Sequence, residues 1–126
     1  ALSRENLFRL QSDAIRKAAG ERSAVFIGRC ADYVLREHPR CVNVFLTADM
    51  DDRIAQVMRR EGLDRAAAER RIENGDRQRA AFYNFYSSGT WGAAATYDLC
   101  VNTSLLGMEE TAELIIGFAR KRLGIL

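Results

Sequence analysis

The sequence has 126 residues, which is the size of one domain with one hydrophobic core. Hydrophobic residues make up 48% of the chain and charged residues 29%, a balance that argues against an intrinsically disordered protein. The net charge is only +2, which argues against a protein that coats DNA.

The cysteines are Cys30, Cys41 and Cys100, which are odd in number and widely separated. We therefore expect neither a disulfide framework nor a zinc site, and predict no metal held by the protein alone. This cysteine usage is typical of a reducing, cytoplasmic compartment. The sequence shows no signal peptide and no apolar run long enough to cross a bilayer, so we predict no membrane association.

The first part of the chain predicts a helix, a strand, a short helix and a second strand. Residues 3–19 have apolar side chains at helical spacing, and Gly20 is a plausible end for this helix. The expected apolar face consists of Leu7, Leu10, Ala14, Ile15 and Ala18. Residues 23–28 (SAVFIG) predict a strand buried on both faces, and residues 41–48 predict another. Residues 31–39 predict a short helix or turn between them.

The second part of the chain continues the alternation. Residues 49–62 predict a helix, with acids in its first turn and arginines in its last, as the helix dipole favours. Residues 63–86 predict a longer helix that begins at Asp64 as its N-cap. A loop, a third strand and a closing helix follow at residues 87–92, 97–104 and 108–126.

Strands that alternate with helices predict an α/β fold, here a three-layer α/β/α arrangement around a parallel sheet. Parallel sheets need helices on both faces, and the predicted helices carry more apolar surface than three strands can cover. We therefore expect the sheet to be incomplete at the N-terminus, and the chain to be the C-terminal part of a longer one.

Polar residues follow each predicted strand, where open α/β sheets bind their ligands. These residues lie at positions 28–30, 47–52 and 102–104. Arg29 directly follows a buried strand, and an arginine that pointed into the core would need a partner. We expect Arg29 to face the ligand crevice; the alternative is a structural ion pair with one of the seventeen acids.

Residues 70–86 (RRIENGDRQRAAFYNFY) place four arginines ahead of four aromatic residues. Asp76 and Arg79 are three positions apart, and Glu73 and Arg77 are four apart, so both pairs can form across a helical turn. Such pairs contribute only about 0.2–0.5 kcal/mol on an exposed helix. The segment alone is therefore compatible with a solvated, salt-bridged helix as well as with a phosphate clamp.

Four runs occur in this order: ENLFRLQSDAIRK, FIGRCADYVLREHPRCVNVFLTADMDDRI, DRQRAAFYNFYSSGTWG and YDLCVNTSLLGMEETAELI. Together they resemble the cytidylate kinase-like family, a branch of the P-loop nucleoside monophosphate kinases, over nearly the whole chain. The resemblance implies a fold like that of the P-loop nucleoside-triphosphate hydrolases. It also implies that residues 1–126 form a single, partial nucleotide kinase-like domain with a helical lid inserted at about residues 64–96.

The resemblance implies roles for individual residues. Arg29 matches the arginine of the family's Gly-Arg-Asp motif, which binds the acceptor monophosphate. Asp76 and Arg79 match the Asp-x-x-Arg of the lid, where the aspartate helps to recognise the acceptor and the arginine reaches its phosphate. The expected substrate-binding residues are Arg4, Arg29, Asp76 and Arg79. The expected catalytic residues are Arg79 and Arg77, and those expected to touch the donor nucleotide are Asn102, Thr103 and Ser104.

The implied activity is phosphoryl transfer from ATP, with Mg²⁺, to a (d)CMP-like nucleotide in the intact parent chain. Two departures from the family pattern weaken this expectation. Cys30 stands where the family has an acid, and no Gly-rich phosphate loop of the form G-x-x-x-x-G-K-[ST] occurs in the sequence.

Two alternatives remain open. One is a nucleotide-binding regulatory domain without catalysis. The other is a nucleic-acid-binding module, with the arginines of residues 70–79 on phosphates and the aromatics of residues 82–86 stacked on bases. We expect nucleotide partners rather than nucleic acid, and a chain that can form a homo-oligomer.

Overall fold

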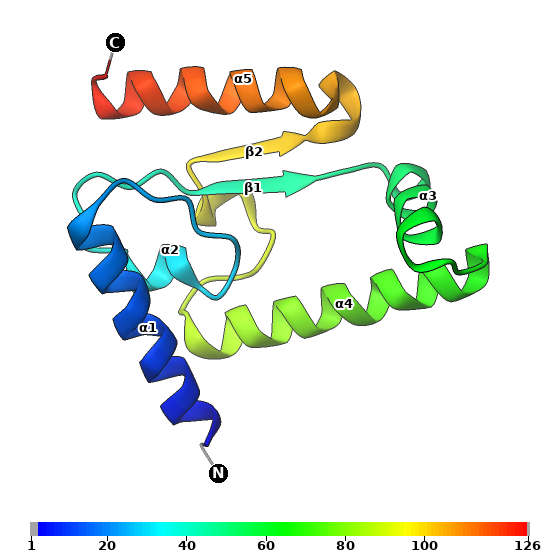
Figure 1. Ribbon diagram of the computed structural model, residues 1–126, viewed down its shortest axis with the longest axis horizontal. Coiled ribbons are helices and arrows are strands. Elements are labelled where there is room, and N and C mark those ends of the chain that lie inside the picture. The colour runs from blue at the N-terminus through cyan, green and yellow to red at the C-terminus, as the bar shows by residue number, and fades with distance from the viewer. Residues whose placement is uncertain (1–2, 126) are drawn as a thin grey trace. The chain divides into compact units, whose positions relative to one another are not determined.

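The computed structural model describes residues 3–125, and the chain divides into two compact units. The first unit ends at Cys41 and contains helices α1 (Arg4–Glu21) and α2 (Ala31–Val34) (Figure 1). The second unit begins at Val42 and contains the strands and the remaining helices. No helix among the described residues combines the length and the apolar character that a membrane span requires.

Helix α1 confirms the predicted first helix but buries a different face. It begins after Ser3, whose side-chain oxygen accepts a hydrogen bond from the Asn6 N–H. Leu7 and Leu10 are about half exposed and Ala14 is exposed, so the predicted apolar face is wrong at these positions, whereas the predicted Ile15 is buried. Phe8, Ile15 and Ala19 pack against Ala31, Val34 and Leu35, and Ser12 is also buried. One position along a helix turns the side chain by about 100°, so burying Phe8 instead of Leu7 turns the start of this face.

The predicted strand at residues 23–28 is not a strand. Val25 and Ile27 are 92% and 93% exposed, and no hydrogen-bonded neighbour runs beside this segment in the described sheet. A strand exists only through pairing, and a run of apolar residues cannot supply its own partner. The sheet of the described residues therefore has two strands rather than the three predicted.

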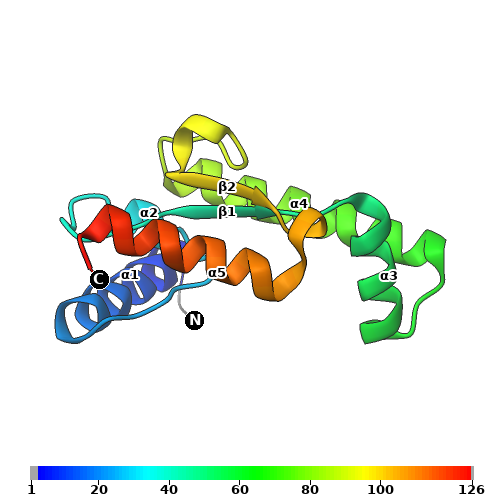
Figure 2. The ribbon, with the colours of Figure 1, turned by 90° about the horizontal axis from the view of Figure 1, so that it is seen from above.

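The second unit is built on a parallel pair of short strands. Strand β1 (Val44–Thr47) pairs with β2 (Leu99–Asn102), with Phe45 opposite Cys100. Helix α5 (Thr103–Leu123) packs along the pair and lies on the side away from α4 (Figures 1 and 2). The parallel α/β character is thereby confirmed for this unit. Both strands are shorter than predicted: β1 lacks residues 41–43 and 48, and β2 ends before Thr103, which begins α5.

Helices α3 (Met50–Glu61) and α4 (Arg65–Tyr86) form the rest of the second unit. Gly62, with φ 66°, ends α3, and Asp64 begins α4 by accepting a hydrogen bond from the Ala67 N–H, as predicted. The two helices pack through a buried apolar cluster of Ile54, Val57, Ala68 and Ile72. This packing fixes how the polar side chains of α3 and α4 face one another.

Aromatic side chains join the loop after α4 to the strands. Phe45 on β1 contacts both Trp91, edge to face with ring centroids 5.2 Å apart, and Tyr97, at 4.8 Å. Tyr83, buried near the end of α4, lies 6.3 Å from Tyr97. Gly92 has a φ of 82° and lies so close to the Phe45 ring that an added Cβ would touch it at 3.5 Å. The short 3-10 helix η1 (Ala94–Thr96) completes this loop.

Candidate functional site

The charged centre of the second unit is a carboxylate shared by two arginines from different helices. Arg53 of α3 donates two hydrogen bonds to Asp76 of α4, at 2.7 and 2.8 Å, in a bidentate arrangement. Arg79, one turn after Asp76, donates a single hydrogen bond of 2.5 Å to the same carboxylate. The predicted pairing of Asp76 with Arg79 is present, and a second arginine joins it.

The electrostatic effect of this cluster is strongest on Asp76. Hydrogen bonding from Arg53 lowers the pKa of Asp76 below its usual value, and Arg79 adds to the effect. The same bond raises the pKa of Arg53. The side chains of Arg53 and Asp76 are both largely buried, whereas that of Arg79 is 55% exposed. Asp76 is therefore ionised at neutral pH, and Arg79 is its accessible partner.

Arg53 and Arg79 border a groove of about 230 Å³ between α3 and α4. Arginines dominate its lining: Arg53, Arg60, Arg71 and Arg79. Glu61 pairs with Arg71 at 3.2 Å at the far end of the groove, while Val57 and Ile72 form part of its floor. Guanidinium groups that converge on a concave surface favour phosphate or carboxylate ligands, because their planar N–H donors fit those groups.

The position of Arg79 depends on two further residues. Its guanidinium folds back over Gly75, where an added Cβ would lie 3.1 Å from a guanidinium nitrogen. On the other side, the guanidinium lies 6.0 Å from the centre of the Trp91 ring. Trp91 is itself held by its backbone N–H, which donates to the Asn84 side chain. Gly75 and Trp91 thus lie beside the resting position of Arg79. Gly75 lies inside continuous helix.

Arg77 does not join this cluster. Two residues along a helix correspond to a rotation of about 200°, so Arg77 and Arg79 point to opposite faces of α4. Arg77 lines a separate depression with Asn74, Gln78 and Ala81. The predicted ion pair between Arg77 and Glu73 is absent from the described residues. The structure therefore separates the two arginines predicted to be catalytic.

The residues predicted to touch the donor nucleotide lie where β1 and β2 end. Asn102 caps α5 by accepting from the Ser104 N–H, and its amide donates to Asp49 at 3.0 Å. The Ser104 hydroxyl accepts from the Asp49 N–H, and Thr103 donates to the Thr47 carbonyl. These side chains hold the two strand ends together. Asn102 ends β2 and caps α5, and Thr103 and Ser104 begin α5, so no separate loop follows the strand.

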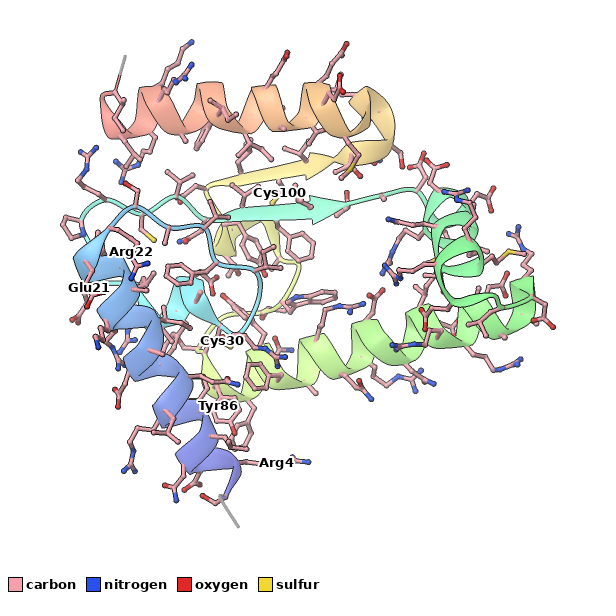
Figure 3. The ribbon with its side chains drawn as sticks, viewed as in Figure 1. Arg4, Glu21, Arg22, Cys30, Tyr86 and Cys100 are labelled. Carbon is pink, nitrogen blue, oxygen red and sulfur yellow. The ribbon has the colours of Figure 1, made fainter. Side chains whose placement is uncertain are left out.

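The remaining predicted residues, Arg4 and Arg29, lie in the first unit. Arg4 begins α1 and its side chain extends away from the helix (Figure 3). Arg29 is exposed and has a φ of 59°, between Gly28 at 71° and Cys30 at 56°. Three successive left-handed residues make a tight turn that costs energy at the two non-glycine positions.

Cys30 is buried, with 4% of its surface exposed. Burial raises the pKa of its thiol to about 11, with a further contribution from the negative charge of Asp32. The thiol is therefore neutral at physiological pH. A neutral thiol cannot provide the charge-assisted hydrogen bonds of the carboxylate that the resemblance leads one to expect here.

Sequence reasoning missed Arg53, which binds both carboxylate oxygens of Asp76. Its signal was its position beside buried residues: Arg53 lies next to Ile54 and one turn before Val57, both in the core of the α3–α4 pair. An arginine at the edge of a buried helix face needs a carboxylate on the neighbouring element. The sequence alone does not say which acid of α4 supplies it.

Comparison with known proteins finds a matching family and a similar solved structure. The cytidylate kinase-like family matches residues 1–105. Among solved structures, an uncharacterized protein from Eubacterium ventriosum ATCC 27560 is similar, with a TM-score of 0.88 and 32% sequence identity. That match covers 91% of this chain and 73% of the other. No curated protein matches.

Proposed function

Because the chain belongs to the cytidylate kinase-like family, we propose that it forms part of a nucleoside monophosphate kinase. The proposed reaction transfers a phosphoryl group from ATP to a (d)CMP-like nucleotide. We propose that the kinase has the three-layer P-loop fold. The observation that carries the proposal is the half-exposed Arg79, which borders an arginine-lined groove on a helix that ends beside the strands.

Phosphoryl transfer requires positioning and charge stabilisation more than covalent chemistry from the protein. In this proposal Arg79 binds the phosphate of a nucleotide and stabilises the charge that develops during transfer. Arg4 and Arg29 have the acceptor-binding role that the family resemblance implies, and Arg77 is a further cation of the lid. The turn at Asn102, Thr103 and Ser104 borders the donor nucleotide.

We propose that Mg²⁺ enters with the ATP phosphates. Two carboxylates near the end of β1 are engaged with protein donors: Asp49 accepts from Asn102, and Asp51 binds Arg65 at 2.8 Å. When bound, the ion would neutralise phosphate charge. The arginines of the groove would add to that neutralisation from the protein side.

A nucleotide-binding domain without catalysis is the second candidate. The buried, neutral thiol of Cys30 favours it, since a carboxylate is expected at that position. The nucleic-acid alternative has less support. Tyr83 is buried, Phe82 and Tyr86 are half-buried, and of these aromatics only Phe85 is exposed enough to stack on a base.

Replacing Arg79 tests the catalytic proposal. In the protein at its full natural length, Arg79→Ala is expected to lower kcat about 10³–10⁵-fold, the range for an arginine that reaches the transferring group. The same change should cost less than about 1 kcal/mol of unfolding free energy, because the Arg79 pair is exposed. Steady-state kinase assays and thermal melts measure the two effects.

Arg65→Ala is the matched control, because Arg65 lies on the same helix and also binds acids, Asp51 and Glu69, at its exposed surface. Its kcat should equal that of the natural protein. Equal activity of the two variants would contradict the catalytic role of Arg79. Nucleotide binding without any turnover in the natural protein would favour the regulatory candidate.

A further inference from the structure

We propose that Asp76 is the resting partner of Arg79, and that a phosphate group displaces Asp76 from Arg79 when it binds. In this proposal Arg53 is a positioning residue: it holds Asp76 in place so that Arg79 can leave. The proposal deepens the proposed function and rests on it for the identity of the ligand as a nucleotide. The exchange itself requires only an anion with phosphate oxygens.

The argument begins with the unequal contacts of the carboxylate. Arg53 binds both oxygens of Asp76 and is largely buried with it, so this contact is rigid and partly shielded from water. Arg79 binds one oxygen, which it shares with Arg53, and is more than half exposed. Exposed single contacts are weak and exchange easily, whereas bidentate arginine pairs are stronger and fix geometry.

The surroundings of Arg79 allow it to move. Gly75 beneath the guanidinium has no side chain to confine it, and Trp91 beside it offers a contact at the edge of the cation–π range. The groove between α3 and α4 opens beside it, with Arg60 and Arg71 further along. Most N–H donors of Arg79 are therefore available to bind an anion in this groove.

This arrangement makes Asp76 a competitor of the ligand. A phosphate must replace the carboxylate on Arg79, and Arg53 makes the replacement easier because it already shares the negative charge of Asp76. Without Arg53, the whole charge of Asp76 would act on Arg79. Removing Asp76 should therefore tighten anion binding, whereas removing Arg53 should weaken it. A purely structural role would give both changes the same sign.

The test measures binding of inorganic tripolyphosphate by isothermal titration calorimetry at fixed ionic strength. Asp76→Asn is expected to lower Kd roughly two- to fivefold, the size of one exposed ion pair. Asp51→Asn is the matched control, because it removes the same charge from an exposed pair that also joins α3 and α4. Its Kd should stay that of the natural chain.

Variants of Arg53 test the positioning role. Arg53→Met and Arg53→Lys are both expected to raise Kd, and the lysine does so without changing net charge because it lacks the fork that holds both oxygens. The double variant Arg53→Met with Asp76→Asn should bind as Asp76→Asn alone does. Circular dichroism verifies the fold of each variant, and the lysine variant carries the test where the methionine variant is unfolded.

Three outcomes would overturn the proposal. The natural chain could fail to bind tripolyphosphate, Asp76→Asn could bind no more tightly than Asp51→Asn, or the double variant could show the full loss caused by Arg53→Met. The last outcome would mean that Arg53 contacts the anion itself.

Titrations with CMP and with ATP separate this proposal from the proposed function. One possible result is that the variants change tripolyphosphate binding as expected while CMP and ATP bind no more tightly than tripolyphosphate. This result would support the exchange at Asp76 and contradict the nucleotide kinase. Tight nucleotide binding with equal effects of Asp76→Asn and Asp51→Asn would support the proposed function and contradict the exchange at Asp76.

Discussion

Cys30 is a buried thiol at a position where the family resemblance leads one to expect an acid. Its backbone has a φ of 56° at the start of α2, so the turn that carries it is constrained. The thiol contributes to the packed interior of the first unit rather than to charge recognition, because burial raises its pKa to about 11. In the proposed function, selectivity for an acceptor then comes from other side chains.

The cysteines should differ in their reactivity toward alkylating reagents, because Cys30 is buried and Cys100 is exposed. At pH 7.5, iodoacetamide is expected to modify the exposed Cys100 and to leave Cys30 unmodified in the folded chain, because the thiolate is the reacting species. In urea, both should react at similar rates. Peptide mass spectrometry measures the modification, and modification of Cys30 at the rate of Cys100 in the folded chain would contradict the buried thiol.

Two glycines in helices differ in whether their backbone conformation requires glycine. Gly75 lies in continuous helix α4, and an added Cβ would meet only the mobile end of Arg79. Gly107 interrupts α5 with a φ of 81° and a ψ of 174°, a conformation that is essentially restricted to glycine.

Alanine at these positions should separate the two cases. Gly75→Ala is expected to raise the unfolding free energy by about 0.5–1 kcal/mol, from the helix preference of alanine. Gly107→Ala is expected to lower it by about 1–3 kcal/mol, from backbone strain. Urea unfolding measures both. A loss of stability in Gly75→Ala would mean that the guanidinium of Arg79 cannot shift.

The link between α3 and α4 should depend on pH. The pKa of Asp76 is lowered in the folded state, so its stabilising effect is present above its unfolded pKa and is lost as the pH falls through the lower folded value. The natural chain should exceed Asp76→Asn by roughly 1 kcal/mol at pH 6. That difference should vanish well below pH 3.8, the ordinary value for aspartate.

Urea unfolding at several pH values measures this difference. Asp51→Asn serves as control, because the carboxylate of Asp51 is 85% exposed and should contribute little at any pH. A difference between the natural chain and Asp76→Asn that does not change with pH would show that the pair contributes no ionic stabilisation.

On the scale of the whole molecule, local signals in the sequence predicted the helices well. Acids and arginines at the ends of residues 49–62, Gly62 as a helix end and Asp64 as a cap all act within a few residues. Features that depend on distant partners were harder to predict. The segment at residues 23–28 has the composition of a strand, but pairing decides whether a strand forms.

The candidate site shows the same limit. The Asp76–Arg79 pair could be predicted because both residues lie on one helix, three positions apart. The Arg53–Asp76 contact spans 23 positions and depends on how α3 packs on α4. Helix geometry also predicts that Arg77 and Arg79 lie on opposite faces of α4. Only the structure shows that the face of Arg79 is the one that borders the groove. Formation of a homo-oligomer remains a prediction.

Trp91 gives the chain an optical property that follows from its place in the second unit. It is the only tryptophan, and its ring lies edge-on to Phe45 of β1 and beside the guanidinium of Arg79. Its fluorescence should therefore change when tripolyphosphate draws Arg79 away, and should stay constant in Arg79→Ala. An identical spectral change in that variant would mean that the signal comes from elsewhere. Where the signal follows Arg79, the emission of one native side chain reports ligand binding without any attached dye.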